Sequence, residues 1–418
     1  MIYIPFIYFL LMLLFVIKKR GTFSMVTVLV FIYTLISFCT ILIDVFDAYG
    51  TDCPKIEINA EPTFVYCALL TMVIYPFYKM QDNLVKGFRP LERTKFIDWV
   101  VYIYFAVFVL MVILLTPDLL RNWALAQVNP NLKGEIWDGS YKLLSLSGIP
   151  LFVGSRCLNI ATGAIFIIPI LFYNLAFRNK SKWFHLMAFC GSLTIIYSSV
   201  LTQDRSRFVY WGLMYLMCYV FFYRFLDRQY TRFINKASIV LGVLIACYII
   251  IMNTRRFSDV AELDNHNMFI INYAGQSFIN FCVFYEKLDL LTYNFEGIFP
   301  ICTRLLGDGD ILDTREWASY VAITNGGVNA LVFSTFIGFI MSYIGHFLTI
   351  IYCILLALIS NKMIKRRDRY SFDIFEFMKV LVFICVPYLG LFGSFYHSHL
   401  TEIFTGCILF MSYKACRK

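Results

Sequence analysis

Charged residues are scarce in this sequence. Asp, Glu, Lys and Arg make up 15% of the 418 residues, whereas hydrophobic residues make up 60%. Soluble domains carry roughly 25% charged residues, so this chain has too little charge to cover the surface of a soluble protein of its length. The composition therefore excludes an ordinary soluble fold and predicts a polytopic membrane protein that contacts the lipid bilayer.

Motifs of common catalytic and binding chemistry are also missing. The chain contains no P-loop, no HExxH, no GxSxG and no dinucleotide-binding glycine pattern. Its 13 cysteines are scattered, mostly in apolar segments, with no CxxC pair and no metal-ligand spacing. We therefore expect neither a metal nor another cofactor. The net charge of +9 is spread over short loops between apolar runs, so we expect no nucleic-acid partner.

Gly/Ser-rich linkers, low-complexity tracts and internal repeats are absent as well. We therefore expect a single membrane domain over residues 1–418. The N-terminal run has no basic start and no small-residue cleavage site, which predicts a retained helix rather than a signal peptide. We predict an all-α, polytopic helix bundle with about eleven transmembrane helices, over residues 2–17, 24–43, 64–78, 97–115, 158–177, 186–202, 208–224, 239–252, 330–359, 375–394 and 399–413.

Basic residues divide unevenly between the two sets of loops. The loops after the first, third, fifth, seventh and ninth predicted spans, together with the C-terminal tail, hold nearly twice as many Lys and Arg as the opposite loops. Cytoplasmic loops are the ones enriched in Lys and Arg. We therefore predict an outside N-terminus, a cytoplasmic C-terminus and one large outer loop over residues 253–329.

Two arginines lie between apolar runs in LTQDRSRFVYWGL, residues 201–213. Arg205 and Arg207 fall at the outer mouth of the sixth and seventh predicted spans, and Asp204 is the only acid nearby. One interpretation is that both side chains reach lipid phosphate from the membrane interface. The other is an anion-binding pair, because the planar guanidinium presents several donors that suit phosphate oxygens.

The long outer loop adds further arginines and an aromatic run. Arg255 and Arg256 open this loop, and Arg304 lies in its second half. Few acids lie near the two arginine pairs, so the outer arginines together predict a site for a pyrophosphate. Aromatic residues from Phe269 to Phe284 recur near helical spacing, which predicts a helix. That helix either lies in the membrane interface or packs onto the bundle.

Three stretches resemble the Wzy-type polymerases, also called oligosaccharide repeat unit polymerases. An S-R motif opens an outer-side helix in DRSRFVYWGLMYL, with Arg207 as the matching arginine. The segment YAGQSFINF, residues 273–281, is similar to a YxGQSxxNF pattern of that family. The segment NGGVNALVFSTFIGFIMSYIGHF, residues 325–347, is similar to the family's Asn-rich entry into a long Gly/Phe helix. The resemblance covers roughly residues 190–360 in pattern and the whole chain in topology.

This resemblance implies a metal-independent, GT-C-like glycosyltransferase of the bacterial inner membrane, related to O-antigen ligase. Such an enzyme polymerises undecaprenyl-diphosphate-linked oligosaccharide repeat units on the outer face of the membrane. It transfers the growing glycan to a new lipid-linked repeat, which builds O-antigen or capsular polysaccharide. The partners that the resemblance implies are the lipid-linked oligosaccharides and a chain-length regulator.

Candidate site residues follow from the charges and the resemblance together. Arg207 and Arg205 are candidates for stabilising the diphosphate as it leaves. Deprotonating the acceptor hydroxyl calls for a base. The candidates for this base are His397, His399, Asp308 and Asp310, although a His at a membrane interface is more often a hydrogen-bonded surface group. The candidate substrate-binding residues are Arg255, Arg256, Arg304, Tyr273, Gln276 and Asn280.

Three other functions stay open at this point. A lipid-linked oligosaccharide flippase would also use cationic residues, but inside the bundle and with short loops. A membrane O-acyltransferase would need a deep catalytic His, for which His346 is the candidate. A scaffolding membrane protein would leave the outer arginines unexplained.

Overall fold

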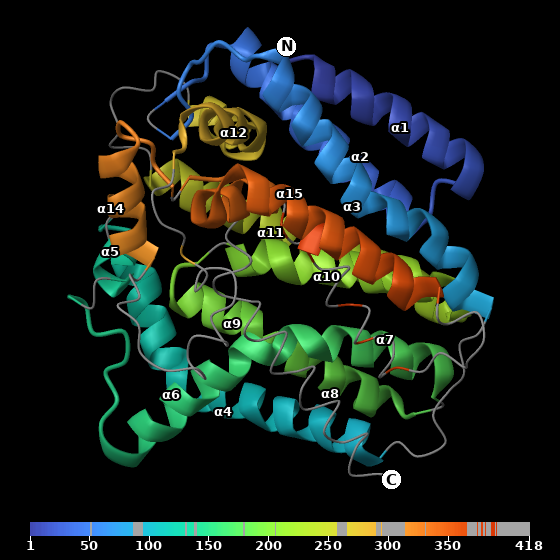
Figure 1. The fold of residues 1–418 in the computed structure, drawn as a ribbon. Helices are drawn as coiled ribbons and strands as arrows, with labels where there is room; N and C mark the ends of the chain where they lie inside the picture. The colour runs from blue at the N-terminus through green and yellow to red at the C-terminus, as the bar shows by residue number, and fades with distance from the viewer. Residues whose placement is uncertain are drawn as a thin grey trace. The chain divides into compact units, whose positions relative to one another are not determined.

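The computed structural model is mostly α-helical and divides into two compact units. Unit 1 comprises Met1–Arg89 and Asn267–Lys418, and unit 2 comprises Pro90–His266. The part of the chain that the structure describes contains no strand, so the predicted all-α class is confirmed there (Figure 1). The described residues are 1–50, 52–86, 95–129, 132–137, 140–178, 180–204, 206–256, 266–289, 294, 314–330, 332–365, 374, 378, 381, 386–388 and 390.

The helices of unit 1 begin and end at residues whose chemistry suits those positions. Pro5 stands in the first turn of α1, where a missing N–H costs nothing. Gly21 ends that helix with a positive φ of 81°. The Ser24 hydroxyl caps α2 by accepting the Thr27 N–H at 3.1 Å. The described helices of unit 1 are α1 (Ile4–Arg20), α2 (Met25–Val45), α3 (Ala60–Lys86), α12 (His266–Lys287), α14 (Thr314–Thr324) and α15 (Phe336–Lys365).

Unit 2 contains α4 and further helices, several of which pack directly against it. Pro117 lies inside α4, and a short 3₁₀ turn, Gly163–Phe166, separates α6 from α7. The described α-helices of unit 2 are α4 (Lys95–Leu125), α5 (Leu132–Trp137), α6 (Gly148–Thr162), α7 (Ile167–Phe177), α8 (Lys182–Ser192), α9 (Thr194–Leu201), α10 (Ser206–Phe222) and α11 (Arg228–Arg256).

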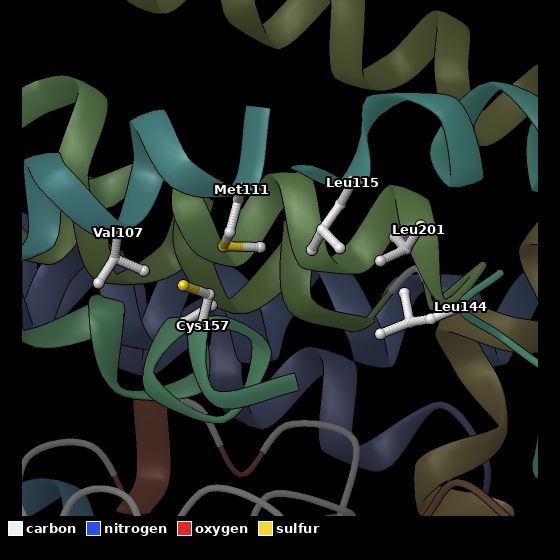
Figure 2. Packing of buried hydrophobic residues seen from close by; sticks show 7 residues of the cluster. Val107, Met111, Leu115, Leu144, Cys157 and Leu201 are labelled. Carbon is white, nitrogen blue, oxygen red and sulfur yellow. The ribbon is translucent and has the colours of Figure 1, made fainter. Parts of the chain in front are cut away.

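One apolar cluster joins α4, α6 and α9 within unit 2. Figure 2 shows Met111 of α4 pointing toward Cys157 of α6, and Leu144 lying beside Leu201 of α9. All four side chains are buried. Leu144 comes from the segment before α6, so this cluster also holds that segment against the helices. Leu201 of this cluster is the last residue of α9.

The structure supports membrane embedding but not the full count of spans. Six described helices are long and apolar enough to cross a membrane, or seven if one bent pair counts as a span. With 17 residues, α1 is at the lower limit of spanning length. Most of the predicted spans 375–394 and 399–413 lies outside the described residues. The prediction of about eleven spans, and that of a single membrane domain, therefore stay predictions.

Two predicted spans are not straight helices. The span predicted over 158–177 begins earlier, at Gly148, and bends by 47° where α6 meets the turn at Gly163. The span predicted over 330–359 begins as a helix only at Phe336 and is kinked at Gly345, whose φ is 70°. Such a backbone conformation favours glycine, because a side chain there would meet the following carbonyl oxygen.

Candidate functional site

The candidate site in unit 2 is the turn between α9 and α10, which carries Arg207. After α9 ends at Leu201, the Asp204 N–H donates to the Ser199 carbonyl at 2.9 Å and closes the turn. Gln203 takes a φ of 55° and is 4% exposed. A positive φ is uncommon for a residue other than glycine. α9 therefore ends at this turn, and Arg207 lies in the first turn of the next helix, α10.

Arg207 is held in place from two sides. Its Nη1 donates to Ser198 Oγ at 2.6 Å. Its Nε lies 3.4 Å from Asp204 Oδ2, an ion pair that lacks the alignment of a hydrogen bond. The Arg207 side chain is 20% exposed, so it is mostly buried, but part of it remains accessible. A guanidinium with one edge fixed by the protein and part of its surface accessible suits the binding of an anion.

A polar cluster that the sequence analysis missed lies on α4. Asp118, 1% exposed, accepts hydrogen bonds from the Ser145 N–H at 3.0 and 3.1 Å and from the Ser145 hydroxyl at 2.5 Å. Arg121 Nη2 forms an ion pair with Asp118 Oδ1 at 3.3 Å. The signal in the sequence was a carboxylate inside an otherwise apolar run. Its partner, Ser145, lies 27 residues away, and local spacing does not reveal such a partner.

Asn122 links this polar cluster to the residues just before the turn of Arg207. The Asn122 side chain is fully buried. Its Nδ2 donates to the Leu201 carbonyl and to the Leu143 carbonyl, both at 3.3 Å. Its Oδ1 accepts from the Tyr141 hydroxyl at 2.8 Å. Asn122 thus connects α4 and the segment before α6 to the last residue of α9, just before the turn.

The other predicted arginines and histidines are not placed by the structure. The backbone of Arg255 and Arg256 forms the last two residues of α11, and their side chains lie outside the described parts. The remaining predicted residues, Arg205, Arg304, His397, His399, Asp308 and Asp310, also lie outside the described residues. The convergence of the outer arginines on one anion therefore stays a prediction.

In unit 1, α12 is a packed helix with an interior face. Phe278, Phe281 and Phe284 are at most 1% exposed, and the rings of Phe278 and Phe281 lie 5.0 and 5.1 Å from that of Tyr66 on α3. The Gly275 carbonyl accepts the Thr40 hydroxyl of α2 at 2.6 Å. This agrees with the alternative in which the predicted aromatic helix packs onto other helices.

The predicted substrate-binding residues of α12 differ in their access. Gln276 is 2% exposed and Asn280 1%. The Asn280 amide donates to the Asp52 carbonyl at 3.0 Å, the Phe333 carbonyl at 2.8 Å and Gln276 Oε1 at 3.1 Å. Asn280 therefore ties α12 to two other segments of unit 1, Gln276 accepts from Asn280 within the helix, and neither amide faces the surface. Tyr273 is 38% exposed, with its ring 4.2 Å from that of Phe333, so it is the accessible member of the three.

His346 follows directly on the kink of α15. Its Nε2 donates to the Tyr285 carbonyl at 2.6 Å, and its ring packs edge-on against the Tyr285 ring at 5.0 Å. The Tyr285 hydroxyl donates to Glu61 Oε1 at 2.7 Å. Partial burial, with the Glu61 carboxylate, raises the pKa of Tyr285 to about 12, which keeps this hydroxyl a donor. His346 therefore has a structural partner here.

Comparisons with known proteins add no relative. No family model matches this chain, and no curated protein or solved structure is found to be similar to it. Among the described residues, no group of three or more His, Cys, Asp or Glu side chains is arranged to hold a metal ion.

Proposed function

We propose that this protein is a membrane glycosyltransferase of the Wzy type. It polymerises undecaprenyl-diphosphate-linked oligosaccharide repeat units on the outer face of the bacterial inner membrane. The growing glycan is transferred to a hydroxyl of a new lipid-linked repeat, and lipid diphosphate leaves. The proposal rests on the resemblance of three stretches to that family and on the geometry of Arg207.

The observation that carries the proposal is the way Arg207 is held. An arginine that merely anchors the chain to lipid would extend from the surface and have no need of a fixed partner. Arg207 instead is 20% exposed and fixed by Ser198 and Asp204 at the start of an apolar helix. Holding a guanidinium before the substrate arrives lowers the reorganisation needed when charge develops on a leaving diphosphate.

The supporting polar groups of unit 2 fit the same role. Asn122 hydrogen-bonds the last carbonyl of α9, and α9 supplies Ser198 to Arg207. The position of the guanidinium is thus determined by α4 as well as by its own turn. A fixed donor at a short distance from a phosphate oxygen is what lowers the barrier to departure of a phosphorylated leaving group.

The test is polymer formation in a strain that lacks its own polymerase. Arg207→Ala is expected to abolish nearly all polymer, and Arg207→Lys to lose much of it, because an ammonium lacks the planar fork. Losing one charge-assisted contact of about 1.5–3 kcal/mol corresponds to roughly a tenfold to hundredfold lower rate when that contact acts in the transition state. Membrane levels of each variant are measured in parallel.

The choice of control variant follows from the structure. Arg178 is unsuitable, because its guanidinium is 7% exposed and pairs with Asp98 at 2.6 Å. Arg224 is exposed in the turn after α10, so Arg224→Ala should leave the polymer ladder unchanged. A normal ladder from Arg207→Ala at normal protein level would make Arg207 a lipid anchor and overturn the proposal. Transport of lipid-linked oligosaccharide without polymer would favour the flippase.

A further inference from the structure

A groove runs between α1, α3 and α15 in unit 1. It has a volume of about 500 Å³, within the roughly 300–1,000 Å³ typical of sites for small molecules. Its lining is predominantly apolar and includes Ala68 of α3 and Ala357 of α15. The groove therefore suits the hydrocarbon part of a ligand.

Two polar features interrupt this apolar lining. The Tyr8 hydroxyl of α1 and the Thr71 hydroxyl of α3 are hydrogen-bonded at 2.7 Å, and the Thr71 hydroxyl in turn donates to the Cys67 carbonyl. Both of these groups have partners. Asn361 of α15 also lines the groove, and its Oδ1 is buried without a hydrogen-bond partner among the described residues. A buried acceptor without a hydrogen-bond partner favours a ligand that has a hydroxyl or N–H donor.

Basic residues lie at the same end of all three helices. The Lys79 ammonium lies 4.9 Å from the ring centroid of Tyr75, which lines the groove. The Arg20 guanidinium of α1 lies 4.4 Å from the ring centroid of Tyr78. On α15, the exposed Lys362 follows Asn361 directly. Positive charge at the mouth of an apolar groove complements an anionic headgroup.

The depth of the groove matches one leaflet of a membrane. Along α3, Pro76 and Ala68 line the groove, three and eleven residues before Lys79. At 1.5 Å per residue, the groove lies about 5–16 Å from Lys79. Half of the hydrocarbon core is about 15 Å thick. With Lys79 at headgroup level, the groove therefore covers the acyl-chain region of a single leaflet.

We propose that this groove binds one molecule of anionic phospholipid with a hydroxylated headgroup, of the phosphatidylglycerol type. One acyl chain lies between α1, α3 and α15. The phosphate faces Lys79, with Arg20 and Lys362 nearby, and a headgroup hydroxyl donates to Asn361 Oδ1. By the predicted orientation this site faces the cytoplasmic leaflet. It involves none of the residues assigned to the polymerase reaction and does not depend on that function.

The experiment is native mass spectrometry of the delipidated full chain, titrated with phosphatidylglycerol or phosphatidylethanolamine. The wild type is expected to bind one phosphatidylglycerol saturably and to prefer it over phosphatidylethanolamine. Lys79→Gln should reduce this preference about fivefold, the effect expected of one cation near an anionic headgroup. Ala68→Trp, which fills the groove, should lower the affinity for both lipids at least tenfold.

Matched controls lie outside the groove. Ile113 of α4 is 66% exposed, so Ile113→Trp places a tryptophan on a different helix, and Lys182→Gln removes a different exposed lysine. Both should bind lipid as the wild type does. If Ala68→Trp elutes as aggregate, Ala357→Phe fills the groove from the opposite side. The proposal is overturned if the wild type binds no phosphatidylglycerol saturably. That result is expected if another part of the chain occupies the groove. Unchanged binding in a folded, groove-filled variant would overturn it equally.

Discussion

At the scale of single residues, buried polar side chains of unit 2 bind backbone groups from distant parts of the chain. The Asp118 carboxylate accepts the N–H of Ser145, and the Asn122 amide donates to the carbonyls of Leu143 and Leu201. Each is inside an apolar environment, where an unpaired polar group would be costly. These contacts determine where the turn of Arg207 lies relative to α4.

A substitution at Asp118 tests this cluster. Asp118→Asn replaces one acceptor oxygen by a donor, so one hydrogen bond from Ser145 is lost and the ion pair with Arg121 disappears. We expect the free energy of unfolding to fall by about 1–3 kcal/mol, measured as a lower thermal midpoint in detergent. Arg121 is 36% exposed, so Arg121→Ala should cost less than about 1 kcal/mol. Arg121 also donates to the Lys142 and Leu143 carbonyls at 3.2 and 3.0 Å, so a larger loss from Arg121→Ala would show that its contacts contribute more to holding the segment than the Asp118–Ser145 hydrogen bonds do.

At the scale of elements, α12 owes its position to close approach of two backbones. A Cβ added at Gly275 would lie 2.5 Å from the carbonyl carbon of Cys39 and 2.6 Å from the Thr40 nitrogen. Backbone atoms of a helix interior cannot move aside as a flexible side chain can. The small residue at this position is therefore what lets α12 pack against α2.

We predict that Gly275→Ala separates these helices. Overpacking of this kind typically costs about 1–3 kcal/mol, and a lower thermal midpoint in detergent would report it. The matched control is Gly212 in α10, where an added Cβ meets no atom within 4 Å. Gly212→Ala should be neutral or should stabilise by up to about 1 kcal/mol, because alanine favours a helix. Equal effects from the two variants would contradict the close approach.

Replacing either of two aromatic residues of α12 by aspartate should affect the level of folded protein differently. Phe281 is fully buried against Tyr66, whereas Tyr273 is 38% exposed. Phe281→Asp would bury a carboxylate without a partner, so we expect the folded protein to be lost from membranes. Tyr273→Asp should leave the protein level within about twofold of wild type, since its side chain can stay hydrated. Immunoblots of membrane fractions measure both, and normal levels of Phe281→Asp would show that α12 is not packed as described.

At the scale of the whole molecule, the described part of the chain is helical, and six of its helices, or seven with the bent pair, are long and apolar enough to cross a membrane. The basic ends of α1, α3 and α15 fall on one side because the three helices run in the same direction. For α1 and α3, Tyr8 contacts Thr71 and Phe15 stacks on Tyr78 at 6.2 Å. For α15, His346 is linked through Tyr285 to Glu61 at the start of α3, whereas Asn361 lines one groove with Tyr75 further along α3. The arrangement of unit 1 is therefore compatible with the positive-inside orientation inferred from the loops.

Reporter fusions test that orientation. After Lys414, a reporter enzyme that functions only in the cytoplasm should be active, and one that functions only outside should be inactive. Before Met1, we expect the opposite pattern. The reason is the excess of Lys and Arg in the loops on the predicted inner side. A signal from an outside reporter at Lys414 would contradict the eleven-span topology.

The sequence by itself determined the class of structure and the approximate place of most described helices. A run of about twenty apolar residues in lipid must satisfy its backbone internally, and a helix does so with its own residues. For this reason α2, α4 and α10 lie close to the predicted spans 24–43, 97–115 and 208–224. Arg207 could also be singled out, because a charge between two apolar runs is visible without a structure.

Only the tertiary structure decided which polar residues are buried and what they hold. Asn280 binds carbonyls of Asp52 and Phe333, and Asn122 binds that of Leu201. These partners are far away in the sequence, so no local pattern distinguishes an amide that ties the fold together from one that binds a substrate. The close approach at Gly275 follows the same rule, because it depends on backbone atoms of α2 that only helix packing brings near.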